Sequence, residues 1–168
     1  SAKTLIAQNI SSFKKDIKPK KRKINISNLH ILFVSRISRK KNLLLLINAV
    51  ISSKNSKNIF ITIIGPSEDT QYLNKCLIRL KEQNISFEYL GALTQNNIEP
   101  FYIKCDIFCL PTLHENYGHV IVEALSFGMP LLISKNTPWR DLELKKVGFD
   151  LDLDESKFAN KIDYLFQI

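Results

Sequence analysis

Two glutamates stand eight positions apart in the stretch CLPTLHENYGHVIVEALSFGMPLLIS, which otherwise has the apolar character of buried protein. Glu115 precedes Gly118 and Glu123 follows it. Eight residues span at most about 12 Å along a helix axis. If a helix begins near Gly118, the free amides of Tyr117, Gly118 and His119 lie between the two carboxylates. Helix-terminal amides attract anions and carboxylates accept hydrogen bonds from sugar hydroxyls, so the spacing predicts a site for a phosphorylated sugar.

Each glutamate also has a plain structural interpretation. Glu115 alone would complement the dipole of the following helix, and Glu123 alone would be an ordinary helix-surface residue. The segment VIVEALSF offers few positions that face solvent, which favours the ligand-binding interpretation of Glu123.

Basic residues follow an earlier apolar run, HILFVS, at residues 30–35. Arg36 and Lys41 flank the expected start of the next helix, where cations oppose the helix dipole unless an anion is also present. This arrangement predicts a phosphate or diphosphate site, and a solvated basic loop is the alternative. Arg39 and Lys40 leave open which of the cations take part.

Glycines end two further apolar runs, and each permits a close backbone approach to a ligand or simply a turn. Gly65 follows the run IFITII, and Gly91 follows SFEYL, with Thr94 placed to cap the next helix. The sequence contains neither G-x-G-x-x-G nor the P-loop pattern, which argues against NAD, FAD and P-loop nucleotide binding.

Apolar strand-length runs alternate with helical periodicity along the chain, and the runs are apolar on both faces. This pattern predicts an α/β domain: a doubly wound, Rossmann-like parallel sheet of about six strands with helices on both faces. Ligands on such sheets bind at the carboxyl ends of the strands. We expect Pro100 near the start of its helix. The expected strands are 30–35, 59–65, 86–91, 107–110, 130–134 and 148–153, and the expected helices are 40–54, 69–83, 96–105, 118–128 and 155–167.

The bulk composition is that of one globular domain of 168 residues, with 45% hydrophobic and 24% charged residues. No apolar run approaches the roughly 20 residues of a membrane span, and no secretory signal pattern opens the chain. Three cysteines, Cys76, Cys105 and Cys109, make neither a disulfide framework nor a zinc pattern. We therefore expect reduced thiols in a cytoplasmic protein.

The net charge is +8, and much of the excess lies in FKKDIKPKKRK, residues 13–23. We expect residues 1–28 to be a basic lead-in or interdomain linker and residues 29–168 to be the ligand-binding domain. The basic run is either a solvated linker or a contact with an anionic membrane surface. No aromatic residues interleave with it, so it lacks a stacking platform for nucleic acid.

Two long blocks resemble a known family. FVSRISRKKNLLLLINAV and YLGALTQNNIEPFYIKCDIFCLPTLHENYGHVIVEALSFGMPLLIS are similar to the C-terminal, donor-binding domain of GT-B-fold retaining glycosyltransferases of family 4 (group 1). The two glutamates fit the E-x7-E motif of that family, and Gly128-x-Pro130 follows as it does there. Ser35 and Asn42 depart from the family pattern, which usually has glycines at these positions.

The resemblance implies a nucleotide-sugar site without a metal. Arg36 and Lys41 would bind the donor diphosphate and stabilise the leaving group, and Glu115 would contact the transferred sugar. Glu123 would bind the ribose. Backbone groups at Asn116, Tyr117, Gly118 and His119 would hold phosphate or sugar hydroxyls, and Gly65, Leu90 and Gly91 would lie along the rest of the donor, with the base near the last two. The donor would be a UDP-, GDP- or ADP-sugar.

The family resemblance also implies an acceptor site in an N-terminal domain that this chain does not contain. We therefore expect the 168 residues to bind a donor but to transfer nothing alone. Transfer with retention to a glycan or lipid-linked acceptor, in bacterial surface polysaccharide or lipopolysaccharide synthesis at the inner face of the cell membrane, is the implied setting. Trp139 stands where many members carry a proline–glutamate pair, and its role is either packing or a wall of the donor or acceptor site.

Two other classes of function compete with this interpretation. A sugar-nucleotide epimerase or a phosphorylase shares the fold, although the E-x7-E spacing and the lack of a pyridoxal-phosphate segment argue against them. A non-catalytic basic module that binds membrane or nucleic acid is the other alternative.

Overall fold

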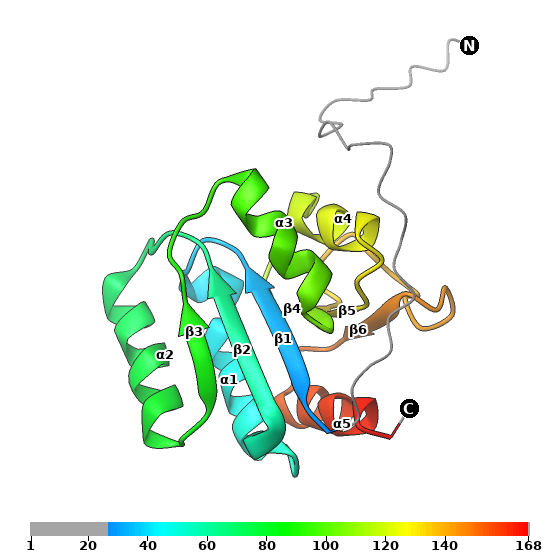
Figure 1. Ribbon diagram of the computed structural model, residues 1–168. Helices are drawn as coiled ribbons and strands as arrows, with labels where there is room; N and C mark the ends of the chain where they lie inside the picture. The colour runs from blue at the N-terminus through cyan, green and yellow to red at the C-terminus, as the bar shows by residue number, and fades with distance from the viewer. Residues whose placement is uncertain (1–26, 168) are drawn as a thin grey trace, which may run out of the picture.

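A computed structural model describes residues 27–167, and in it a six-stranded, all-parallel sheet has the order β3-β2-β1-β4-β5-β6 (Figure 1). This confirms the predicted Rossmann-like α/β class. The expected lead-in, with its basic run, lies outside the described residues except for its last two positions. The strands are β1 (Leu29–Val34), β2 (Ile59–Ile64), β3 (Ser86–Tyr89), β4 (Ile107–Leu110), β5 (Leu131–Ser134) and β6 (Gly148–Leu151).

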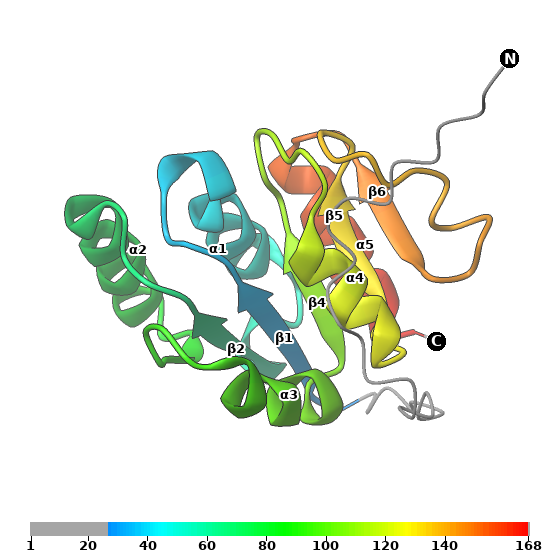
Figure 2. The same cartoon turned by 90° about the horizontal axis from the view of Figure 1, so that it is seen from above.

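Helices cover both faces of the sheet. One face carries α1 (Leu43–Ser52), α2 (Thr70–Glu82) and α5 (Glu155–Leu165), and the other carries α3 (Gln95–Lys104) and α4 (His119–Ser126) (Figures 1 and 2). Two short 3-10 helices, η1 (Arg39–Lys41) and η2 (Ser56–Asn58), precede α1 and β2. Because the sheet is covered on both faces, every residue of β4 and β5 is buried.

The core contains the three cysteines, none of which is in a disulfide. Burial raises the pKa of the Cys76 thiol to about 11 and that of Cys105 to about 12, so both remain protonated at neutral pH. In the described part of the chain, no helix has both the length and the apolar character that crossing a bilayer requires.

Local backbone conformation accounts for three differences from the sequence predictions. Asn42 adopts a left-handed conformation (φ 57°) and splits the expected helix 40–54 into η1 and α1. Pro100 lies inside α3 and not near its start, so the carbonyl four residues earlier loses its helical donor. Thr94 occupies the N-cap position of α3, but its side chain makes no capping hydrogen bond, so that part of the prediction is wrong.

The register aligns the carboxyl ends of neighbouring strands at one edge of the sheet. Val34 of β1 pairs with Ile64 of β2, and Leu110 of β4 pairs with Ile133 of β5. The loops that follow these strands are therefore brought together, as the position of a ligand site on a parallel sheet requires. Gly65, directly after β2, packs so closely that an added Cβ would lie 1.9 Å from the carbonyl oxygen of Ser35.

This packing makes Gly65→Ala a severe substitution. The φ of Gly65 is 142° and the clash is with backbone, so we expect a loss of about 3 kcal/mol in the free energy of unfolding, measured by urea denaturation. Gly91→Ala is the matched control, because Gly91 also has a positive φ (65°) but nothing lies within 4 Å of an added Cβ. We expect Gly91→Ala to lower the free energy of unfolding by about 1 kcal/mol. Equal losses in the two variants would contradict this account of Gly65.

Candidate functional site

The loops after β1 and β4 lie side by side because these two strands are adjacent in the sheet. The connections leave β1 toward β2 on one side and β4 toward β5 on the other, so this is the point where the strand order reverses. Open parallel sheets bind ligands in the crevice at that point. The residues after β1 include Arg36 and Lys41, and the residues after β4 include Glu115.

The β4–α4 loop, residues 111–118, is tied to both neighbouring loops by hydrogen bonds. On the β1 side, the amide of Leu113 and the hydroxyl of Thr112 both donate to the carbonyl of Lys40, at 2.8 and 3.1 Å. On the β5 side, the amide of Glu115 donates to the carbonyl of Asn136 at 3.0 Å, and the side-chain amide of Asn136 donates to the carbonyl of Leu113 at 2.9 Å. The loop is therefore held in one position relative to the loops after β1 and β5.

Lys41 and Glu115 form an ion pair at the centre of these loops. The Lys41 Nζ to Glu115 Oε2 distance is 2.5 Å, and the two side chains are only 11% and 16% exposed. A charge this far from solvent is stable only with a partner of opposite sign. The pairing shows that Lys41 is not a solvated surface lysine, which was the alternative interpretation of the basic loop.

Arg36 lies in a different environment. Its guanidinium pairs with Glu68 on the loop after β2, and both side chains are largely exposed. Arg39 similarly pairs with Asp69, with 3.2 Å between Nε and Oδ2. Sequence reasoning missed both carboxylates, although they stand in the segment GPSED that follows β2. Exposed pairs of this kind contribute about 0–1 kcal/mol, so Arg36 is readily released to another anion.

Helix α4 begins at His119, as the position of Gly118 predicted. Gly118 is the N-cap residue with φ 78°, and an added Cβ would lie 2.8 Å from Cδ1 of Ile121. Within residues 27–167, the amides of Tyr117, Gly118 and His119 donate to no protein acceptor. These groups are the unpaired first-turn donors that favour an anion.

Glu123 lies on the second turn of α4 and is held by a residue that sequence reasoning missed. The hydroxyl of Tyr102, on α3, donates to Glu123 Oε2 at 3.1 Å. Tyr102 is fully buried and stacks on Phe127, with ring centroids 5.3 Å apart. Burial, and next the charge of Glu123, raise the pKa of the phenol above its ordinary value, so Tyr102 remains a donor. The only sequence signal was an aromatic residue at a buried helical position.

The remaining predicted residues lie on neighbouring strand-end loops. The amide of Gly65 donates to the carbonyl of Gly91 at 2.7 Å, and Leu90 bonds to the end of β2, so the two glycine loops are joined. The side chain of Asn116 contacts His114, with 2.7 Å between Oδ1 and Nε2. Among the described residues, no group of three or more histidine, cysteine, aspartate or glutamate side chains could hold a metal ion.

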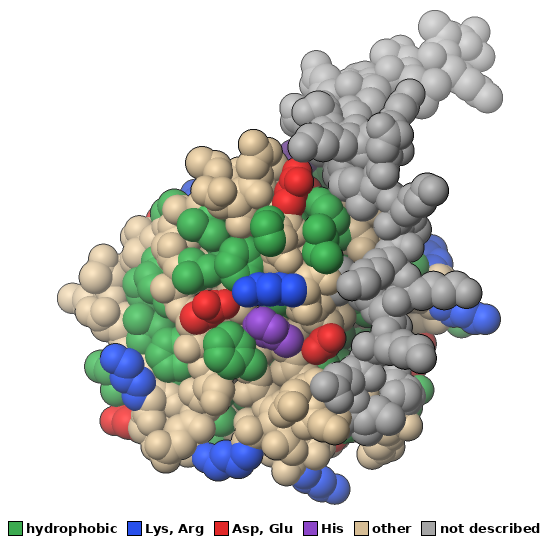
Figure 3. All heavy atoms as spheres, in the orientation of Figure 1, with side chains coloured by type: hydrophobic (Ala, Val, Ile, Leu, Met, Phe, Trp, Pro, Cys, Tyr) green, Lys and Arg blue, Asp and Glu red, His purple; other side chains and the backbone are tan. Residues whose placement is uncertain are grey.

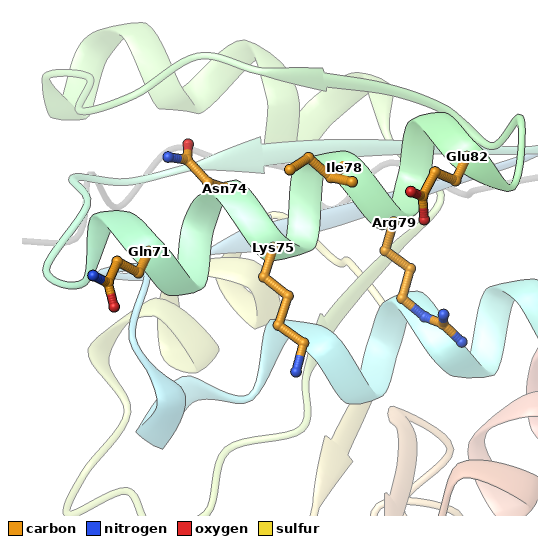
Figure 4. Close-up of a pocket in the computed structure, with 6 residues that line it drawn as sticks. All are labelled: Gln71, Asn74, Lys75, Ile78, Arg79 and Glu82. Atoms are coloured by element: carbon orange, nitrogen blue, oxygen red, sulfur yellow. The ribbon is translucent and has the colours of Figure 1, made fainter.

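Two cavities in the described part of the chain lie away from the strand-end loops. A depression of about 520 Å³ lies on the outer surface of α2, where all of its lining side chains come from one helix (Figure 4). A smaller cavity of about 260 Å³ lies near the start of β6 and the end of α5. Neither contains the converging charges and free amides of the strand-end loops, so we place the candidate site at those loops. The face that carries α3 and α4 shows charges of both signs and no patch of one sign where it is visible (Figure 3).

The sequence model of the family described as Glycosyl transferases group 1 matches residues 14–167. The chain belongs to this family. The family assignment confirms the resemblance that the two sequence blocks carried.

A curated relative and two solved structures illustrate the likeness of this group 1 domain. An uncharacterized glycosyltransferase of Methanocaldococcus jannaschii, MJ1607, is 27% identical over 104 residues, which are 62% of this chain and 26% of the relative. The C-terminal domain of a group 1 protein, LpcC, from Francisella tularensis has a TM-score of 0.74 at 17% identity, with 90% and 86% of the two chains covered. Anabaena HepE, solved with UDP-glucose, has a TM-score of 0.69 at 21% identity, with 82% and 38% covered.

The two structures show that this group 1 domain has the fold of a GT-B glycosyltransferase domain, and in LpcC the domain with this fold is the C-terminal one. The chain spans about a quarter of the length of the curated relatives that it matches.

The two kinds of ion pair predict different stability losses. We expect Glu115→Gln to lower the free energy of unfolding by about 2–3 kcal/mol, because it leaves Lys41 poorly solvated without a counter-charge. The exposed pair provides the control, and Glu68→Gln should cost less than about 1 kcal/mol. Urea denaturation measures both losses, and the double variant Lys41→Met/Glu115→Gln should be less unstable than the sum of its single variants. Additive losses would show that the buried pair is not coupled.

Proposed function

We propose that this group 1 domain binds the nucleoside-diphosphate sugar donor of a retaining glycosyltransferase. The observation that carries the proposal is the buried Lys41–Glu115 pair beside the free amides that begin α4. Such a donor has an anionic diphosphate, which suits a cation and unpaired amides, and sugar hydroxyls, which suit a carboxylate; this group of loops contains all three kinds of protein group.

In this proposal Lys41 and Arg36 bind the diphosphate. When the bond between the sugar and the diphosphate breaks, its electron pair leaves with the phosphate oxygen, and the sugar carbon becomes positively charged. Fixed cations and the amides at residues 117–119 stabilise the leaving group without the need for a metal, while the carboxylate of Glu115 contacts the sugar. Because Arg36 has only an exposed partner, it can turn to the diphosphate at small cost.

Glu115 has a second role in this proposal, because it already holds Lys41. The pair keeps the ammonium group in place within a poorly solvated setting. A bound diphosphate then shares a cation that is already oriented, so the donor need not order the lysine side chain.

Glu123 would accept hydrogen bonds from the ribose hydroxyls. Tyr102 donates to Oε2, and within the described residues no protein group donates to Oε1, which leaves that oxygen for a ligand. The backbone at Leu90 and Gly91 would lie along the base, with Gly65 beside them. The UDP-glucose complex of the similarly folded HepE supports a nucleotide sugar as the ligand class, with UDP, GDP or ADP as the nucleotide.

Transfer itself would require a further domain that binds the acceptor, so we propose that residues 1–168 bind the donor but are inactive alone. The short span of the chain relative to its curated relatives supports this view. Retention, a glycan or lipid-linked acceptor, surface polysaccharide or lipopolysaccharide synthesis, a cytoplasmic location and contact of the basic 13–23 run with the inner membrane face all stay predictions from the family resemblance.

A thermal-shift and calorimetry panel of UDP-, GDP- and ADP-glucose tests the proposal. At a ligand concentration about 100 times Kd, the matching donor should stabilise the domain by about 2.7 kcal/mol. Lys41→Met should weaken binding at least tenfold, because it removes a charged partner of the diphosphate. Lys75→Met, on the outer surface of α2, is the control and should bind as the wild type does. Absence of binding by all three nucleotide sugars at millimolar concentration would refute the proposal.

The ribose assignment has its own test. Glu123→Gln should weaken UDP binding about tenfold, because one hydrogen bond to a charged group is lost. It should leave the affinity for 2′,3′-dideoxy-UDP unchanged, since that ligand lacks the hydroxyls. Calorimetric titration of both ligands against both proteins completes the comparison, and an equal loss for the two ligands would show that Glu123 does not contact the ribose.

A further inference from the structure

Trp139 makes a hydrogen bond that neither packing nor a simple site wall explains. Its indole Nε1–H donates to the backbone carbonyl of Tyr117 at 2.8 Å. The contact joins the loop between β5 and β6 to the β4–α4 loop at the residue before Gly118, which is the N-cap of α4. Trp139 is half-buried and is the only tryptophan in the sequence.

The bonded carbonyl belongs to the peptide that also carries the amide of Gly118. No described peptide bond is cis, so in this planar unit the carbonyl and the N–H point in opposite directions. Holding the carbonyl of Tyr117 toward the indole therefore turns the Gly118 N–H away from Trp139. That N–H is one of the amides that donate to no acceptor in residues 27–167.

The orientation of this peptide needs an external constraint. Gly118 has φ 78° and ψ 60°, and a glycine accepts the backbone angles on either side of a peptide rotation at little steric cost. Aromatic side chains also contact one another here, since the centroid of the Tyr117 ring lies 4.8 Å from that of His119 and 6.5 Å from that of Trp139. Among these contacts, only the indole bond acts on the peptide group itself.

Trp139 is itself fixed by its own loop. Its amide donates to the hydroxyl of Thr137 at 3.2 Å, and Thr137 is buried. The guanidinium of Arg140 donates to the carbonyls of Thr137 and Trp139. The hydrogen-bonded turn after β5 therefore fixes the position of the indole.

We propose that Trp139 is a positioning residue whose indole N–H orients the Tyr117–Gly118 peptide, so that the Gly118 amide faces an anionic phosphate oxygen of the bound ligand. The inference rests on the proposed function, because it assumes a nucleoside-diphosphate ligand at this loop. It assigns to Trp139 a role in the site that requires its N–H and not merely its bulk.

Deleting the N–H while keeping an aromatic ring tests the inference. Two replacements do so: Trp139→Phe, and benzothienylalanine at position 139, which exchanges the N–H for sulfur in a ring of almost the same shape. The second replacement remains informative if the smaller phenyl ring disturbs folding. Both proteins and the wild type are titrated with UDP by calorimetry, and the backbone amide of Gly118 is followed by NMR with ¹⁵N-labelled glycine.

In the wild type, UDP should shift the Gly118 amide resonance downfield as the N–H acquires an anionic acceptor. Without the indole N–H, the Kd for UDP should rise about fivefold, the effect of one hydrogen bond, and the Gly118 shift should be lost or greatly reduced. A purely structural role would lower stability without removing that shift.

The outcomes separate the two proposals. If the wild type binds UDP but the benzothienylalanine protein keeps the same Kd and the same Gly118 shift, the positioning role is wrong and the donor site stands. If the wild type binds none of the nucleotide sugars or UDP, the proposed function is wrong and this inference falls with it.

Discussion

The buried contact between Lys41 and Glu115 is the interaction on which the candidate site depends. It joins residues 74 positions apart, and it exists because β1 and β4 are neighbours in the sheet. A poorly solvated ammonium group cannot be left without a counter-charge, so the loops that carry the two residues must remain together. The hydrogen bonds from Leu113 and Thr112 to Lys40 hold the same two loops in place.

The cations of the site differ in how firmly they are held. Lys41 has a buried partner, whereas Arg36 and Arg39 have exposed carboxylate partners whose attraction is weakened by solvent. The site therefore combines one fixed positive charge with others that can be redirected. A ligand with two phosphates suits this arrangement, because one phosphate can meet the fixed charge while the other recruits a mobile one.

The order of strands and helices follows from the sequence because each apolar run is buried on both faces and must be part of a covered parallel sheet. The positions of Arg36, Lys41 and Glu115 in the loops after strands, and of Glu123 on the helix after β4, follow from the same pattern. The residues that contact these side chains could not be predicted from that pattern. The choice of Tyr102 for Glu123, of Glu68 for Arg36 and of the Tyr117 carbonyl for Trp139 depends on how separate loops meet in space. Periodicity carries no information about such contacts.

Two predictions about the backbone of the helices were also wrong. The helical periodicity of residues 40–54 does not show the left-handed conformation of Asn42 that ends η1 and precedes α1, although asparagine tolerates this conformation and the family usually has glycine there. Proline preference predicted Pro100 near the start of its helix, whereas α3 (Gln95–Lys104) continues on both sides of the proline.

The pairing of β1 with β4 also has a kinetic consequence. Ile31 pairs with Ile107, so this central contact closes a chain segment far longer than any of the β1–β2 or β2–β3 connections. Closing a long segment is entropically costly, and contacts between distant positions slow folding. The first three strands can associate through nearby connections, but the ligand crevice comes into existence only when the second group of strands joins them. Assembly of the candidate site therefore requires that the two groups of strands pair and does not follow from the formation of either group alone.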